Sequence, residues 1–147
     1  MVSVAFSSFP GVSGSVADAR RFVTAAIRLC PRITAPEEVL DRAELIISEL
    51  ATNAIRHTRS GDPGESFAVR VQVDHRGVRA EVRTRAPRLW HCVPRVVTPG
   101  DPFAEHGRGL LLVDRLATRW GVLAPWEGGV YFALHWPTGH HGTEAKE

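Results

Sequence analysis

The spacing of hydrophobic residues changes along the chain, and each change predicts a helix or a strand. Residues 15–30 and 35–58 carry hydrophobic side chains at intervals of three and four positions, the period of a helix buried on one side. Residues 2–9, 67–73 and 78–82 alternate between hydrophobic and polar side chains, as strands do when one face is buried. The first half of the chain is therefore predicted to form a strand, two helices and a hairpin.

The second half continues with the same two periods on either side of a long irregular segment. Residues 108–118 have a helical period, and residues 120–124 and 130–136 form a second predicted hairpin. Residues 85–106 have no clear period and contain several prolines, and a loop of this length is usually functional or mobile. Mostly antiparallel strands with about three helices stacked on one face predict an α+β two-layer sandwich.

The longest predicted helix has a defined start and a clear hydrophobic side. Thr34 and Glu37 have the spacing of a capping box, and Pro36 suits the first turn because its missing N–H group does no harm there. The side chains expected to face the core are Val39, Leu40, Ala43, Ile46, Ile47, Leu50 and Ala54. The remaining polar positions of this helix need a separate explanation.

Glu49 and Asn53 lie four residues apart on that helix and therefore share one face of it. An acid and an amide are costly to bury without partners, so this face is expected to border a cleft or the solvent. The carbonyl oxygen of Asn53 is a suitable ligand for Mg²⁺, and Glu49 is placed to accept a proton from an attacking water or hydroxyl. A solvated helix face, with Asn53 bonded to a neighbouring loop, is the simpler alternative.

A second group of candidate residues lies at the predicted start of the third helix. Gly107 and Gly109 would let a phosphate approach the backbone, and Arg108 adds a positive charge. Leu110 follows them in the first turn, where unpaired N–H groups can bind a phosphate. An ordinary junction between a loop and a helix also explains these glycines. Both candidate groups nevertheless call for the same ligand, a metal-bound polyphosphate.

The composition fits a single globular domain. The chain has 147 residues, of which 44% are hydrophobic and 23% are charged. We expect the domain to span residues 1–138 and the polar tail, residues 139–147, to be disordered. No hydrophobic stretch has the length of a membrane span and no secretory signal is recognisable, so cytoplasmic residence is the default expectation.

The charge pattern and the cysteines argue against further classes of function. The formal net charge is +2, and the arginines are scattered rather than arranged in a basic stripe with aromatic residues. Neither nucleic acid nor a membrane is therefore an expected partner. Cys30 and Cys92 do not make a zinc site or a disulfide framework. Residues 90–92, Trp-His-Cys, form either a docking patch for a partner or a part of the core.

Several motifs together resemble the histidine-kinase-like ATPase superfamily. They are Glu-Leu-x-x-Asn-Ala-x-x-His at residues 49–57, the following hairpin, a proline-rich lid, and Gly-Arg-Gly-Leu-Leu-Leu-Val at residues 107–113. The resemblance extends from about Phe6 to Trp136. Within the superfamily, the chain most resembles small stand-alone ATP-binding regulators of actinobacteria that are related to anti-sigma-factor serine kinases.

The resemblance implies a Bergerat-type nucleotide site with ATP and Mg²⁺ as cofactors. In such a site Asn53 would coordinate Mg²⁺, and Glu49 would act as the general base or orient the attacking water. Gly107, Arg108 and Gly109 would close over the phosphates at the end of the lid. Catalysis in such sites rests mainly on positioning and on neutralisation of charge by the metal.

Three features depart from the family's pattern at the end of the site that would hold the base. The family has an aspartate after the strand before the lid, where it accepts a hydrogen bond from the adenine amine, and this chain has Thr84 there. Residues 85–87 lack the family's glycine, and Gly129 stands where the family often has a threonine that supports the adenine. Loss of a charged acceptor costs about 1.5–3 kcal/mol, or roughly ten- to a hundredfold in affinity. ATP binding should therefore be weak, poorly selective for adenine, or absent.

Two hypotheses about function follow from the resemblance. The first is a cytoplasmic regulator that binds ATP and acts on a sigma factor or an anti-sigma-factor antagonist, with serine/threonine protein kinase activity as one form of that action. The second is a protein-interaction module that has kept the fold, works without nucleotide and has a degenerate ATP site. Both hypotheses stay open at this point, as does a homodimer.

Overall fold

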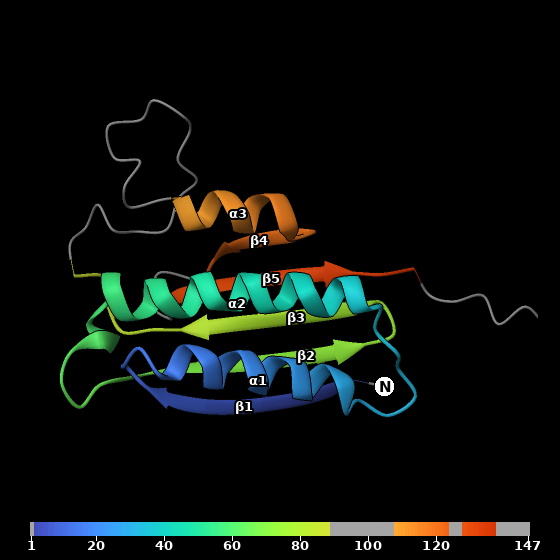
Figure 1. Cartoon of the computed structure of the whole chain (residues 1–147), viewed down its shortest axis with the longest axis horizontal. Helices are drawn as coiled ribbons and strands as arrows, with labels where there is room; N and C mark the ends of the chain where they lie inside the picture. Colours follow the sequence, from blue (N-terminus) through green and yellow to red (C-terminus); the bar gives the residue numbers. More distant parts are fainter. Residues whose placement is uncertain (1, 89–107, 124–127, 138–147) are drawn as a thin grey trace, which may run out of the picture.

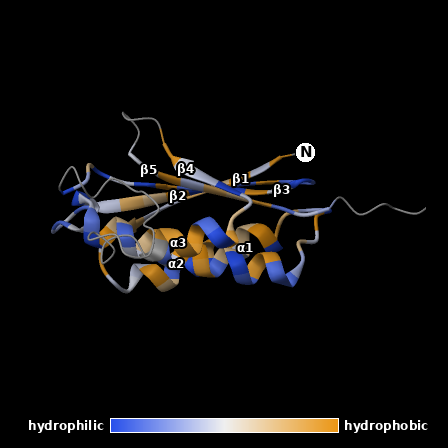
Figure 2. Cartoon of the chain, turned by 90° about the horizontal axis from the view of Figure 1, so that it is seen from above, coloured by the Kyte–Doolittle hydropathy of each residue, from blue (hydrophilic) through white to orange (hydrophobic). Residues whose placement is uncertain are grey.

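The computed structural model describes residues 2–88, 108–123 and 128–137, and in these residues a five-stranded sheet is covered on one face by three helices (Figure 1). Seen from above, the helices lie together on one side of the sheet (Figure 2). Every pair of neighbouring strands is antiparallel. The predicted α+β two-layer sandwich is therefore confirmed.

The elements follow the predicted order along the chain, with one short 3₁₀ helix in addition. They are β1 (Ser3–Pro10), α1 (Ser15–Arg28), α2 (Glu37–His57), η1 (Arg59–Gly61), β2 (Ser66–Asp74), β3 (Gly77–Arg83), α3 (Arg108–Leu116), β4 (Arg119–Val122) and β5 (Gly129–His135).

The strands are arranged in the order β1-β2-β3-β5-β4, so the last strand in sequence lies inside the sheet and β1 and β4 form its edges. β2 and β3 form the predicted hairpin through a tight turn at His75 and Arg76. The Asp74 side chain accepts hydrogen bonds from the backbone N–H groups of Arg76 and Gly77 at 2.7 and 3.1 Å. These bonds stabilise the turn and therefore the register of the hairpin.

The core lies between the inner face of the sheet and the hydrophobic sides of the helices. Strand β2 alternates buried and half-buried residues along its whole length, as expected when one face is covered. The α2 residues predicted to face the core are all buried: Val39, Leu40, Ala43, Ile46, Ile47, Leu50 and Ala54. Phe67 and Phe132 are the largest fully buried side chains, and each contributes roughly 1.5–3 kcal/mol through burial.

The predicted capping box at the start of α2 is wrong. The helix begins at Glu37, and the residue before it, Pro36, has φ −58° and ψ 143° and makes no side-chain cap. The Pro36 carbonyl instead accepts hydrogen bonds from the N–H groups of Val39 and Leu40 at 3.0 and 3.3 Å. Because the backbone is extended at Pro36, Thr34 lies outside the helix and does not cap its free N–H groups.

Part of the sequence prediction falls outside the described residues. This applies to Gly107, to the Trp-His-Cys group at residues 90–92, to the rest of the irregular segment after residue 88, and to the tail at residues 139–147. Within the described ranges, no helix combines the length and the hydrophobicity that crossing a bilayer requires. The first residues of the irregular segment, 85–88, contact the end of α2 and belong to the site described next.

Candidate functional site

The helix α2 presents Glu49 and Asn53 on its flank next to α3. Figure 1 shows α2 between α1 and α3. On the flank toward α1, the Arg20 side chain donates a hydrogen bond to Ser48 Oγ at 3.3 Å. With about 3.6 residues per turn, Glu49 and Asn53 fall on the other side of the buried stripe, toward α3. Both are half-buried, and within the described residues neither side chain has a hydrogen bond or ion pair, so both can bind a ligand.

Three segments that are distant in sequence meet at one end of the molecule. The second half of α2, the end of β3 and the beginning of α3 all lie at this end (Figure 1). α3 begins at Arg108, and the first N–H groups of a helix have no partner within it. Leu110 is buried in the core, so it can offer a ligand only its backbone N–H group. Such groups, together with the positive end of the helix dipole, attract phosphate.

Backbone hydrogen bonds attach residues 85–88 to the chain that follows α2. The N–H group of Arg85 donates to Ser60 Oγ at 2.8 Å, and Ser60 is fully buried. The N–H group of Arg88 donates to the carbonyl oxygen of His57, the last residue of α2, at 3.0 Å. The end of β3 is therefore held beside the end of α2.

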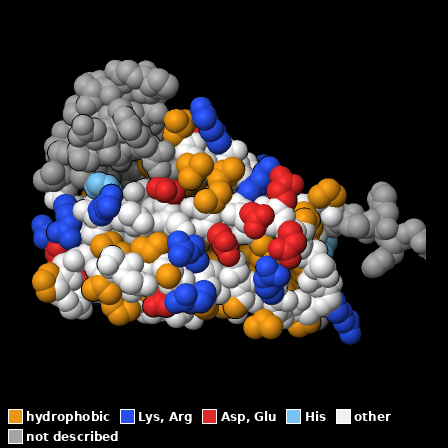
Figure 3. Space-filling model, in the orientation of Figure 1, with side chains coloured by type: hydrophobic (Ala, Val, Ile, Leu, Met, Phe, Trp, Pro, Cys, Tyr) orange, Lys and Arg blue, Asp and Glu red, His pale blue; other side chains and the backbone are white. Residues whose placement is uncertain are grey.

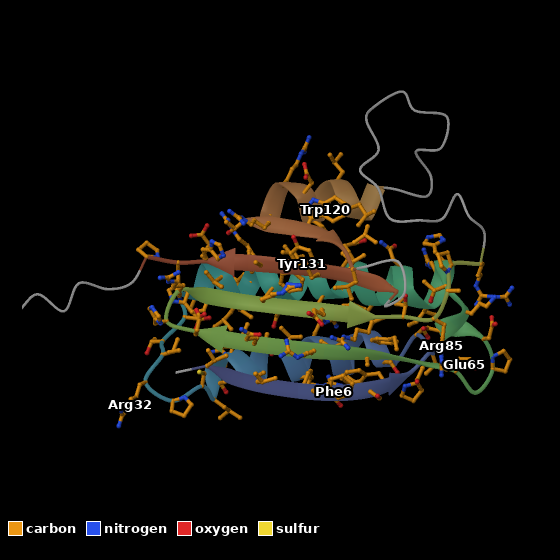
Figure 4. All side chains as sticks on the ribbon, turned by 180° about the vertical axis from the view of Figure 1, so that it is seen from behind. Phe6, Arg32, Glu65, Arg85, Trp120 and Tyr131 are labelled. Carbon is orange, nitrogen blue, oxygen red and sulfur yellow. The ribbon has the colours of Figure 1, made fainter. Side chains whose placement is uncertain are left out.

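Two ion pairs add to this attachment. Arg85 lies 3.1 Å from Glu65, and Arg88 lies 2.5 Å from Asp62 (Figure 4 labels the first pair). Their side chains are between 31% and 66% exposed, so each pair contributes at most about 1 kcal/mol. This attachment was not predicted from the sequence. The signal for it in the sequence is the opposite charge of the two loops, with arginines after β3 and acids after η1.

The described residues that could hold Mg²⁺ are few. No group of three His, Cys, Asp or Glu side chains within the described ranges could hold a metal ion. Mg²⁺ usually keeps several waters and binds substrate phosphates, so one amide oxygen is enough when the metal arrives on a polyphosphate. Asn53 and Glu49, half-buried on the flank of α2 toward α3, are therefore the described residues that could border the phosphate end of a nucleotide site.

One known protein family matches most of the chain. The model of the histidine kinase-like ATPase domain matches residues 9–123, well over half of the chain. The chain belongs to this family. The match includes Glu49, Asn53 and Thr84 and ends before β5. It supports, at this coarse level, an ATP-binding regulatory domain. The chain matches no curated protein.

This histidine kinase-like ATPase domain departs from the expected pattern at the end of the site that would hold the base. Thr84 directly follows β3 and is half-buried, and its N–H group donates to the carbonyl oxygen of Gly128 at 3.2 Å. Within the described residues the Thr84 hydroxyl has no hydrogen bond. A hydroxyl can accept a bond from a base but adds no charge to it, and neutral hydrogen bonds are roughly half as strong as charge-assisted ones.

Gly129 cannot be exchanged for threonine without a change in this backbone. Its φ is +126°, a conformation that residues with a side chain rarely adopt. A Cβ atom at this position would lie 2.1 Å from the carbonyl oxygen of Val82 in the neighbouring strand β3. The close approach of β3 and β5 therefore requires glycine at position 129. A return to threonine would need a change in the backbone as well as in the side chain.

Proposed function

We propose that this histidine kinase-like ATPase domain is a cytoplasmic regulator that binds a magnesium nucleoside triphosphate mainly through its phosphates and acts on a protein partner. The observation that carries this proposal is the meeting of α2, the end of β3 and the start of α3 at one end of the molecule. Glu49 and Asn53 lie on the flank of α2 that borders this place. Because the Thr84 side chain carries no charge, we expect the site to select the base only weakly.

Each candidate residue has a defined role in this proposal. The side-chain oxygen of Asn53 would bind Mg²⁺, and the N–H groups at the start of α3 would hold phosphate oxygens. When bound, the magnesium nucleotide supplies the phosphoryl group that is transferred. Glu49 would accept the proton of the attacking hydroxyl or water. Thr84 would be the uncharged neighbour of the base.

The proposed partner is a sigma factor or an anti-sigma-factor antagonist, and the proposed reaction is phosphorylation of a serine or threonine on the antagonist. The test is incubation of the full chain with γ-labelled ATP, Mg²⁺ and candidate antagonists. Glu49→Ala should abolish transfer of label, and Glu44→Ala, which removes an exposed carboxylate of the same helix, should not. Two results would contradict the role of Glu49. One is an equal loss of label transfer in both variants, and the other is undiminished label transfer in Glu49→Ala.

A second candidate function is a protein-interaction module that works without nucleotide. The conformation of Gly129 favours it, because this backbone leaves no space for the side chain that supports adenine in the family. Partner binding that is unchanged by Mg·ATP and by Asn53→Ala would favour the module. Partner binding that changes on addition of Mg·ATP in the wild type, and does not change in Asn53→Ala, would favour the nucleotide-dependent regulator.

A further inference from the structure

The outer face of the sheet, which the helices do not cover, contains a hollow of about 850 Å³ beside the β2–β3 turn. Residues that pair directly across antiparallel strands lie on the same face. Arg79 of β3 pairs with Ala133 of β5, which pairs in turn with Arg119 of β4. Gly77 pairs with His135 in the same way. The small Ala133 and Gly77 therefore form the floor, and longer side chains form the walls.

The walls of this hollow carry an excess of positive charge. Three arginines, Arg76, Arg79 and Arg119, line it, against a single acid, Asp74. The Asp74 side chain already accepts two backbone N–H groups of the β2–β3 turn, at 2.7 and 3.1 Å. Arg76 and Arg119 have no ion pair within the described residues. Their charges are therefore not neutralised by neighbouring side chains.

Arg79 is held in place by two contacts on this face. It lies 3.4 Å from Glu81, a buried carboxylate that also pairs with Arg83 at 2.8 Å. Its guanidinium lies over the ring of Tyr131, 4.1 Å from the centroid (Figure 4 shows Tyr131 on this side). One carboxylate is thus shared between two arginines, and an excess of positive charge remains. On the helix side of the molecule, acidic and basic side chains are interspersed (Figure 3).

We infer that this hollow binds an acidic peptide segment, rich in Asp and Glu, of a partner protein. The charges of the walls are complementary to such a segment. A second copy of the chain that docked through the same hollow is unfavourable, because it would bring arginines against arginines. A single phosphate would fill only a small part of a hollow of about 850 Å³. Nucleic acid is disfavoured, because the two described aromatic residues of this hollow offer no open ring for a base to stack on: Arg79 covers Tyr131, and Trp136 is buried.

The hollow and the candidate nucleotide site lie at opposite ends of β3. The hollow includes Gly77, where β3 begins, and the nucleotide site would adjoin Thr84, which follows its last residue. The helices cover the sheet between the two places on the other face. The inference shares with the proposed function the idea of a protein partner, but it does not depend on nucleotide. Binding at the hollow can therefore be tested without ATP.

The test is fluorescence anisotropy of a labelled Glu/Ala peptide titrated with the full chain at low and at high salt, without nucleotide. Arg119→Glu and Arg76→Glu should each weaken binding by about tenfold or more, because each reverses one charge of the wall. The control is Arg32→Glu, which makes the same change of net charge on an exposed loop between α1 and α2. This control should bind like the wild type, and high salt should weaken binding in every case.

Four results would overturn the inference. One is that Arg32→Glu weakens peptide binding as much as Arg119→Glu and Arg76→Glu do, which would make binding an effect of net charge alone. A second is tighter binding of a single-stranded oligonucleotide than of the peptide. A third is tighter peptide binding after Glu144→Gln and Glu147→Gln, which would make the chain's own tail the occupant. A fourth is no binding of the peptide to folded wild type. A failure of ATP binding in a separate titration bears only on the proposed function.

Discussion

Thr84→Asp restores the charged acceptor that the family uses for adenine, and we expect it to tighten ATP binding. The position can accept the change because Thr84 is half-buried, directly after β3, and its hydroxyl has no hydrogen bond to lose within the described residues. The backbone contact that fixes it, from its N–H group to the Gly128 carbonyl at 3.2 Å, does not involve the side chain. The fold should therefore be the same in the variant.

The expected gain follows from the strength of one hydrogen bond. A bond to a charged group contributes about 1.5–3 kcal/mol, and a neutral bond contributes about 0.5–1.5 kcal/mol. The difference is about 1–1.5 kcal/mol, or roughly tenfold in the dissociation constant. Because Thr84 is only half-buried, water screens part of the new charge, and the gain belongs at the lower end of the range expected from sequence alone.

Isothermal titration calorimetry of Mg·ATP and Mg·GTP with the full chain measures this gain. Thr84→Asp should tighten ATP by about tenfold and should not tighten GTP, because guanine has a carbonyl oxygen where adenine has the amine. Thr84→Asn is the matched control, because asparagine has nearly the same shape as aspartate but carries no charge. An equal gain in Thr84→Asn, or a wild type that already binds ATP tightly and is unaffected by Thr84→Asp, would refute the reasoning.

Three further predictions concern the stability of the sheet, and each is measured by urea unfolding. Gly129→Ala should lower the free energy of unfolding by more than about 1 kcal/mol, because its Cβ atom would lie 2.1 Å from a backbone oxygen of β3; an unchanged midpoint would contradict this. Phe132→Ala should cost about 3–5 kcal/mol because the ring is fully buried, whereas Val122→Ala, at a position 45% exposed, should cost far less. Glu81→Ala should cost only about 1 kcal/mol, because its arginine partners are 37% and 40% exposed and can turn to water; a cost above about 3 kcal/mol would mean that they cannot.

The order of the elements and the core side of α2 could be predicted from the sequence because both depend on local periodicity. Ile46, Ile47 and Leu50 were placed in the core by their spacing alone, and they are buried. The start of α2 was misjudged because a capping pattern is a short signal, and the geometry of Pro36 decided the outcome. Periodicity also gave no information on the position of β5 between β3 and β4.

Some residues of the candidate site could be proposed from the sequence. Glu49 and Asn53 stand out in sequence because polar residues on the flank of a hydrophobic helix need a reason, and the structure places them on the flank next to α3. The attachment of Arg85 and Arg88 to the chain after α2 was missed because it joins residues twenty or more positions apart in the sequence. The reason for glycine at position 129 was missed because only coordinates show how closely β3 approaches it.

The central claim is that α2 and the start of α3 together hold the phosphates of a magnesium nucleotide. Thermal unfolding of the full chain with and without Mg·ATP tests it most directly, with Asn53→Ala beside Ser48→Ala, which lies on the opposite flank of α2. A ligand at about 100 times its dissociation constant stabilises by about 2.7 kcal/mol, which raises the melting temperature by roughly 5–10 °C. We predict this rise for the wild type and for Ser48→Ala and its loss in Asn53→Ala. No rise in the wild type at millimolar Mg·ATP, or the same rise in Asn53→Ala, would contradict the claim.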